Sequence, residues 1–203
     1  MNKKKFKKTW KKIWWFIWED NSIWSWIVNI ILAFLIIKFL FYPGLGLIVG
    51  TQHPIVAVVS SSMEHNETFD KWWPYQNQWY SKMDISKERF ETFPFKNGFN
   101  KGDIIFLIGS NPKDIRIGNI IVFQSAKPDP IIHRVVAKWQ YNEKYYFQTK
   151  GDNRLTNQES IRSTQIDETN ISENTVIGKA LFRVPWLGYV KIWIVELMKL
   201  FSF

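Results

Sequence analysis

The sequence contains no cysteine, and this absence removes several kinds of chemistry at once. Disulfide frameworks, thiolate metal sites and cysteine nucleophiles are all excluded. Histidine is also scarce: with only three in 203 residues, a histidine-rich metal centre is not expected. The sequence therefore predicts a protein that works without a metal or another cofactor.

Acidic residues are fewer than basic residues, and the difference is largest in the N-terminal 50 residues. Asp and Glu number 18 against 27 Lys and Arg, for a net charge of +9. Residues 1–50 hold eight lysines against only Glu19 and Asp20, so most of the positive excess lies there. A nucleic-acid-binding domain would carry its charge on a folded binding face. The distribution predicts contact with an anionic membrane surface and no nucleic-acid partner.

Long apolar runs are absent except for one, at residues 23–42, where Lys38 is the only charged residue. About 20 apolar residues in a helix span a hydrocarbon core of roughly 30 Å. A buried core helix would show a polar face, and a cleaved signal peptide would have a shorter run followed by small residues. The run therefore predicts a transmembrane helix over residues 23–42, ended by Pro43 and the glycines that follow it.

Residues 1–22 alternate lysine with tryptophan, phenylalanine and isoleucine. This pattern is typical of an amphipathic segment that lies on anionic headgroups with its aromatic rings in the interface. Seven lysines precede the apolar run, which places the N-terminus in the cytoplasm by the positive-inside rule. We expect a single-pass protein of the cell membrane whose remaining residues lie outside the cytoplasm.

Beyond the apolar run, residues 43–184 show short β-branched stretches separated by Gly, Pro, Asn and Asp. This alternation predicts a mainly β domain with an antiparallel or mixed sheet, and the chain length suits one such domain plus an anchor. The expected strands are residues 54–59, 103–108, 119–123, 130–139, 144–149 and 176–184.

Two segments depart from the strand pattern. Residues 64–100 are polar and aromatic, so we interpret them as an insertion packed on the sheet, with one helix over residues 85–92 capped by Ser86. Residues 185–203 mix charged with apolar residues and are too charged for a comfortable span. They predict a short amphipathic helix at the membrane interface, with a second span as the alternative.

Candidate catalytic residues follow or lie within three of the expected strands. Ser60-Ser61-Ser62-Met63 ends the first strand, and a serine becomes a nucleophile when a base is within hydrogen-bond reach. His133 lies beside Arg134 inside an apolar strand, an arrangement that requires partners for both side chains. Asp152 follows another strand in Thr149–Asn153, where a carboxylate could hold a histidine tautomer. Taken singly, these patterns are common in turns and cores; together they predict Ser-His-Asp chemistry. His65 lies in a polar stretch and is expected at the surface.

With these residues in this order, the sequence resembles the type I signal peptidases. The resemblance covers roughly residues 23–190, and residues 64–100 lie outside the common pattern. Bacterial members carry a lysine base where this chain has His133, so the resemblance is to the archaeal and endoplasmic-reticulum branch. A single chain without cysteine favours an archaeal origin. The matching motifs are Ser60–Met63, residues 101–105, residues 132–136, Thr149–Asn153 and residues 177–180.

The resemblance implies a membrane-bound serine endopeptidase that removes signal peptides from exported preproteins and associates with the secretion machinery. It assigns Ser62 as the nucleophile and His133 as the base. The Ser60 hydroxyl and the Ser62 backbone N–H would form the oxyanion hole. The substrate would add as a strand to the edge at residues 55–59.

The third catalytic residue is less clearly marked. Members of this branch often carry a second Asp five or six residues after the Gly-Asp pair, where this chain has Asn157 and Gln158. We therefore take Asp152 as the acid, with Asp167 and Glu159 as alternatives. If the altered loop has abolished turnover, the chain would instead be an inactive membrane-anchored β domain that binds extended peptides.

Overall fold

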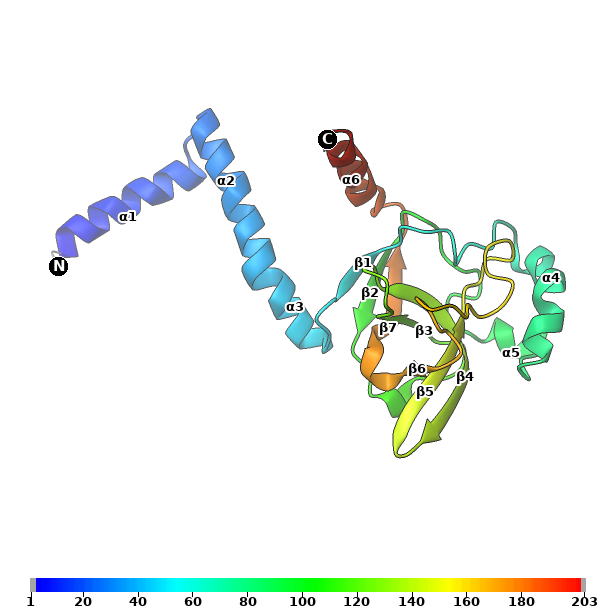
Figure 1. Cartoon of the computed structure of the whole chain (residues 1–203). Coiled ribbons are helices and arrows are strands. Elements are labelled where there is room, and N and C mark those ends of the chain that lie inside the picture. The colour runs from blue at the N-terminus through cyan, green and yellow to red at the C-terminus, as the bar shows by residue number, and fades with distance from the viewer. Residues whose placement is uncertain (1–2, 202–203) are drawn as a thin grey trace. The chain divides into compact units, whose positions relative to one another are not determined.

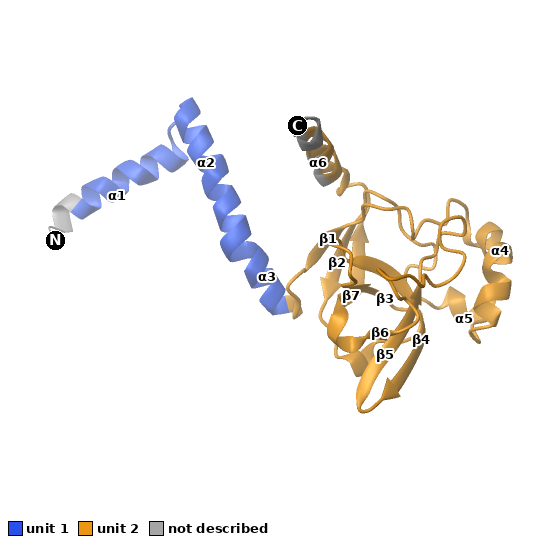
Figure 2. Cartoon of the chain, viewed as in Figure 1, with its two compact units in different colours: residues 1–48 blue, residues 49–203 orange. Residues whose placement is uncertain are grey.

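The computed structural model describes residues 3–201, except for the side chains of residues 3–5, 191, 195 and 198–201. The chain divides into two compact units, Met1–Ile48 and Val49–Phe203, coloured blue and orange in Figure 2. Residues 1–2 of the predicted interfacial segment and residues 202–203 of the predicted C-terminal helix lie outside the described residues.

The first unit is helical (Figure 1). Helix α1 (Lys3–Trp18) is followed by α2 (Ile23–Ile36), which continues through the π-helical turn η1 (Ile37–Phe41) into α3 (Tyr42–Val49). The stretch Ile23–Val49 is long and apolar enough to cross a membrane, which agrees with the predicted apolar N-terminal helix.

The apolar helix does not end at Tyr42, where the sequence predicted its end. Proline has no N–H and its ring clashes with the carbonyl four residues earlier, so Pro43 should break a regular α-helix. Here the wider turn η1 precedes Pro43 and accommodates the ring, so the helix runs on to Val49.

The second unit contains a seven-stranded sheet in which every neighbouring pair is antiparallel (Figure 1). The strand order is β1-β2-β7-β3-β4-β5-β6. The predicted mainly β fold is therefore confirmed, and only the two-residue strand β6 had no pattern that predicted it. The strands are β1 (Ile55–Ala57), β2 (Ile104–Ile108), β3 (Ile120–Phe123), β4 (Ile131–Tyr141), β5 (Lys144–Lys150), β6 (Ile171–Ser172) and β7 (Val176–Val184).

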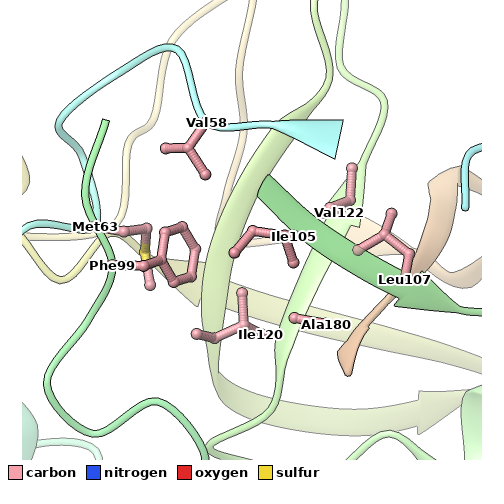
Figure 3. Close-up of a cluster of buried hydrophobic side chains, with 8 residues drawn as sticks. All are labelled: Val58, Met63, Phe99, Ile105, Leu107, Ile120, Val122 and Ala180. Atoms are coloured by element: carbon pink, nitrogen blue, oxygen red, sulfur yellow. The ribbon is translucent and has the colours of Figure 1, made fainter. Parts of the chain in front are cut away.

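One buried cluster fixes the segment that follows β1. Met63 is fully buried and packs with Val58, Phe99 and side chains from β2, β3 and β7 (Figure 3). Val58 and Met63 thus anchor both ends of the serine turn, and the three serines between them are left at or near the surface. The cluster comprises Val58, Met63, Phe99, Ile105, Leu107, Ile120, Val122 and Ala180.

The segment at residues 64–100 contains α4 (Phe69–Ser81) and α5 (Lys87–Glu91). The predicted cap is confirmed: Ser86 Oγ accepts from the Arg89 N–H at 3.2 Å. Helix α4 was not predicted, because Pro74 and mixed polar and aromatic residues concealed its single buried face. That face packs on Phe90 and on Val136 of β4.

Two short 3-10 turns, η2 (Pro112–Asp114) and η3 (Glu173–Thr175), connect strands, and α6 (Tyr189–Phe201) follows β7. The turn into α6 is tied to the sheet, because the Gly188 N–H donates to the Gly102 carbonyl at 2.8 Å. Gly102 has φ +89° and carries the Tyr189 ring so closely that a Cβ would lie 2.1 Å from it. Trp186 and Trp193 point outward and are largely exposed.

Candidate active site

The serine turn is held by backbone hydrogen bonds to a neighbouring loop. The Val58 N–H donates to the Asp103 carbonyl and the Gly102 N–H donates to the Val58 carbonyl, both at 2.9 Å. In the residues that follow Val58, Ser60 Oγ lies 3.3 Å from Ser62 Oγ. The two hydroxyls are therefore close enough to act on the same substrate atom or its neighbour.

A groove of about 450 Å³ runs past this turn and brings the predicted Ser62 and His133 to one site. Ser60 also lines it, as the resemblance implied. Among the described residues, no hydrogen bond joins Ser62 to His133, although both line the groove. The lining comprises residues 57–62, Lys127, residues 129–133, Thr156, Asn157, Ile161 and Ile166.

His133 is almost completely buried in β4, and its Nδ1 is hydrogen-bonded to Glu168 Oε1. The Glu168 carboxylate has no exposed surface and is held from two more sides. Thr149 Oγ1 donates to Oε1 at 2.7 Å, and the Ile161 N–H donates to Oε2 at 2.8 Å. A carboxylate on Nδ1 favours the tautomer with its proton on that nitrogen, which leaves Nε2 free to accept a proton.

Asp152, the acid chosen from the sequence, does not contact His133. Its carboxylate accepts from Arg134 Nε at 2.9 Å and from Arg134 Nη2 at 2.6 Å, and both residues are fully buried. Burial by itself would raise the pKa of Asp152, but the positive Arg134 and nearby His65 hold that pKa well below its usual range. Asp152 is thus the partner of Arg134, and the position beside His133 belongs to Glu168.

The two alternative acids also lie away from His133. Asp167 is exposed and accepts from the Thr169 N–H at 2.9 Å. The hydrogen bond from the Thr169 hydroxyl lowers the pKa of Asp167 below its ordinary value. This effect is larger than that of burial, which acts to raise the pKa. Glu159 is exposed as well. Neither side chain contacts the imidazole among the described residues.

A signal for Glu168 was present in the sequence. Side chains alternate between the two faces of an extended segment. Ile166 and Glu168 are both buried and Asp167 between them is exposed. Glu168, and not Asp167, is thus the inward acid, and its place two residues after the apolar Ile166 is the only signal that the sequence offered for it.

The Gly-Asp-Asn turn contacts the backbone of Ser62, the predicted nucleophile, directly through Asn153. The Asn153 N–H donates to the Ser62 carbonyl at 2.8 Å, and Asn153 Nδ2 donates to the Ser61 carbonyl at 2.9 Å. These bonds fix the backbone on either side of the Ser62 nitrogen, which the resemblance assigns to the oxyanion hole. Asn153, which was not among the candidate residues, therefore holds the backbone of the serine turn.

His65 is another residue whose environment differs from the expectation. It was expected at the surface but is only 2% exposed, and its ring stacks on Trp72 with 3.9 Å between centroids. Its Nε2 lies 3.5 Å from Asp152 Oδ2. His65 therefore packs in the buried surroundings of Asp152 and does not line the groove.

No group of three or more His, Cys, Asp or Glu among the described residues is arranged to hold a metal ion. The groove holds a hydroxyl and a buried imidazole, and the imidazole is hydrogen-bonded to a carboxylate. Such a set can activate a hydroxyl for attack on a carbonyl and return the proton to a leaving group.

Two curated yeast proteins similar to this chain carry the same name. The "Signal peptidase complex catalytic subunit SEC11" of Komagataella phaffii is 30% identical over 164 residues, covering 78% of this chain and 76% of that protein. The protein of the same name from Saccharomyces cerevisiae strain YJM789 is 28% identical over 160 residues, covering 78% and 75%. No family model matches the chain.

Proposed function

Because the chain belongs to the family of SEC11 signal peptidase catalytic subunits, we propose that it is a serine endopeptidase that removes signal peptides from exported preproteins. The observation that carries the proposal is the groove lined by both Ser62 and His133, with Glu168 on the far nitrogen of the imidazole. The family supports a peptidase, and these three side chains are our choice for its serine mechanism.

In this mechanism the substrate binds as an extended strand along β1. This strand lies at one end of the sheet and pairs only with β2 among the described strands, so its outer edge can accept a further strand. The groove begins at the same strand, at Ala57. A peptide bound there would present its scissile carbonyl to Ser62.

The chemical step then follows from the positions of the side chains. Ser62 Oγ attacks the carbonyl carbon while His133 Nε2 takes its proton, and the negative Glu168 stabilises the imidazolium. Ser60 Oγ and the Ser62 N–H donate to the developing oxyanion. The C–N bond breaks as His133 returns the proton to the leaving amine, and water then releases the acyl group from Ser62 by the same route.

The protein is membrane-anchored, as its apolar helix and its relatives indicate. We propose a cell-membrane location with the N-terminus in the cytoplasm, the catalytic unit outside, and α6 at the lipid interface. The yeast relatives are named as subunits of a signal peptidase complex, which supports our proposal that this chain associates with secretion machinery. Because these relatives are yeast proteins, an archaeal origin stays a prediction.

The competing function is an inactive membrane-anchored domain that binds extended peptides. It would use the same free edge of β1 and the same groove but would need no nucleophile. The two functions therefore differ in what they require of the Ser62 hydroxyl.

The test is cleavage of a labelled preprotein by the full chain in detergent micelles with lipid. Ser62→Ala should reduce cleavage by at least about 10³-fold, because the nucleophile is lost. Ser60→Ala should lose less, on the order of 10²-fold, since one oxyanion donor is removed. Ser61→Ala, the matched control in the same turn, should keep most of the activity. Unchanged function in Ser62→Ala would favour the binding domain.

A further inference from the structure

The segment that follows the nucleophile leaves the sheet and returns to it at the same point. Glu64 and Gly98 form an antiparallel bridge, and the Phe99 N–H donates to the Met63 carbonyl at 3.1 Å. Residues 64–98 are thus a closed excursion that starts two positions after Ser62. It contains α4 and α5, and it is the segment that the resemblance left outside the common pattern.

This excursion contacts the Gly-Asp-Asn turn through α4. Trp72 is fully buried, and its indole Nε1 donates to the Asp152 backbone carbonyl at 2.8 Å. The Tyr80 hydroxyl, near the C-terminal end of α4, donates to Asp152 Oδ1 at 3.4 Å. Both bonds are buried, so α4 restrains the backbone and the side chain of Asp152 together.

The restrained turn is packed tightly on the nucleophile. A Cβ at Gly151 would lie 2.7 Å from the Ser62 carbonyl oxygen and 2.6 Å from Asn157 Cγ. Asn153 donates to the same Ser62 carbonyl and to the Ser61 carbonyl, so a shift of the turn would move the Ser61–Ser62 backbone. A displacement of Asp152 would therefore be passed on to the Ser62 N–H and Oγ.

The excursion also holds the residue beside the base. Arg134 Nη1 donates to the Pro94 carbonyl at 2.9 Å and Nη2 donates to the Phe95 carbonyl at 2.8 Å. The guanidinium lies over the Phe90 ring, with 4.8 Å from Cζ to the centroid. The strand position next to His133 is thus fixed by the same segment that fixes the turn beneath Ser62.

We infer that residues 64–98 position the two reacting groups relative to each other, with Trp72 as the positioning residue for Ser62. This inference rests on the proposed peptidase function. Trp72 does not line the groove, so it acts through Asp152 and Asn153 and does not touch the substrate. A misplacement of about 1 Å at a reacting group can cost on the order of 10²-fold in rate.

Trp72→Phe is the direct test, and Trp73→Phe is its matched control. Both tryptophans are buried in the same aromatic cluster, so both variants lose similar packing. Of these two indoles, only that of Trp72 donates to the backbone of the 151–153 turn among the described residues. We expect kcat to fall about 10-fold or more in Trp72→Phe with KM changed less than about twofold. Trp73→Phe should lower the melting temperature similarly and keep its kcat.

A second measurement does not depend on cleavage. Hydrogen exchange in peptides that cover residues 58–66 and 151–157 should rise in Trp72→Phe and stay as in the wild type in Trp73→Phe. Equal kcat values and equal exchange in the two variants would overturn the inference. If the wild type does not cleave preproteins, the proposed function fails, while the exchange comparison still decides the positioning.

If Trp72→Phe does not fold, Tyr80→Phe and Asn153→Ala replace it, because each removes a further hydrogen bond that links α4 to the serine turn through residues 152 and 153. Each should lower kcat more than KM. Wild-type kcat in both folded variants would equally overturn the inference.

Discussion

His133 and Arg134 are neighbours in β4, and their side chains point to opposite faces of the sheet, as strand geometry requires. Each is buried, so each needs its own acceptor. Arg134 is paired with Lys150, the last residue of the neighbouring strand β5. The chain continues from Lys150 directly into the turn that contains Asp152, and this places the Asp152 carboxylate beside the arginine. The imidazole on the other face is left to Glu168.

This division predicts different losses from two neutralised carboxylates. Glu168→Gln should reduce kcat by on the order of 10³–10⁴-fold, because the amide cannot stabilise the imidazolium. Asp152→Asn should instead lower the free energy of unfolding by about 3–5 kcal/mol, because Arg134 stays buried without its counter-charge. Cleavage assays and denaturant titrations measure the two effects separately. The exposed Asp167→Asn is the control and should change neither.

The assignment of Glu168 would be contradicted by the reverse result. In that case Asp152→Asn would lose its kcat at wild-type stability, and Glu168→Gln would cleave normally. If both variants kept their kcat, the enzyme would use Ser62 and His133 alone.

Lys150 predicts a pH dependence of stability. It is fully buried, its Nζ donates to the Gly151 carbonyl at 2.8 Å, and the Trp79 and Tyr80 rings lie over it. Burial lowers the pKa of Lys150 to about 8, although Asp152 and Glu168 act to raise it. Between pH 8 and about 10.4, where an unfolded lysine titrates, the unfolded state binds more protons than the folded state.

The free energy of unfolding should therefore rise with pH in this window, by about 2 kcal/mol between pH 7 and pH 10 from Lys150 alone. Lys150→Met should flatten the rise, and the surface variant Lys82→Met should leave it as in the wild type. Urea titrations of the full chain in detergent, followed by tryptophan fluorescence, measure the slopes. The same slope in Lys150→Met and the wild type would show that the buried amine does not titrate there.

At the scale of elements, the sequence predicted what short-range patterns encode. Six β-branched runs gave six of the seven strands, and Ser86 marked the start of α5. Helix α4 was missed because its buried face is made of aromatic residues that find their contacts in Phe90 and β4, and no short window contains those contacts. Strand β6 was missed because only its pairing with β5 makes it a strand.

The β4–β5 hairpin offers a test of local backbone strain. Tyr141 pairs with Lys144, so Asn142 and Glu143 form a two-residue turn, and their φ values of 47° and 63° are both positive. Asparagine tolerates this conformation, whereas glutamate is strained in it and glycine is the preferred second residue. Glu143→Gly should therefore stabilise the protein by about 0.5–1 kcal/mol.

Thermal unfolding would show this gain as a rise in Tm of about 1–3 °C. Asn142→Gly is the control in the same turn and should gain less, since asparagine already accepts a positive φ. A lower Tm for Glu143→Gly would mean that the glutamate side chain makes a stabilising contact outweighing its backbone strain.

At the scale of the whole molecule, the site joins segments that are far apart in the chain. Ser62 follows β1, His133 lies in β4, and Glu168 comes at the end of a loop after β5. The first two stand in motifs that the sequence displays locally. The partner of His133 depends on how the loop at residues 153–170 folds back, which is set by bonds such as the one from Ile161 to Glu168. No local motif reports this long-range contact, and this is why the sequence pointed to Asp152 as the acid beside His133.

The distribution of charge along the whole chain predicts its orientation. Seven lysines precede the apolar helix, and after Lys38 the next lysine or arginine is Lys71. Basic residues near a span stay in the cytoplasm, so α1 should be inside and the catalytic unit outside. Because the chain has no cysteine, single-cysteine variants report the side of the membrane without background.

Two such variants are Lys11→Cys in α1 and Leu155→Cys, at a side chain that is 67% exposed in the catalytic unit. On intact cells a membrane-impermeant maleimide should label Leu155→Cys and spare Lys11→Cys, and after lysis it should label both. Replacing the seven N-terminal lysines by glutamine should weaken this asymmetry, because the charge difference that sets the orientation is then removed. The opposite pattern on intact cells would place the catalytic groove in the cytoplasm, where it could not meet exported preproteins, and would contradict the proposed function together with the orientation.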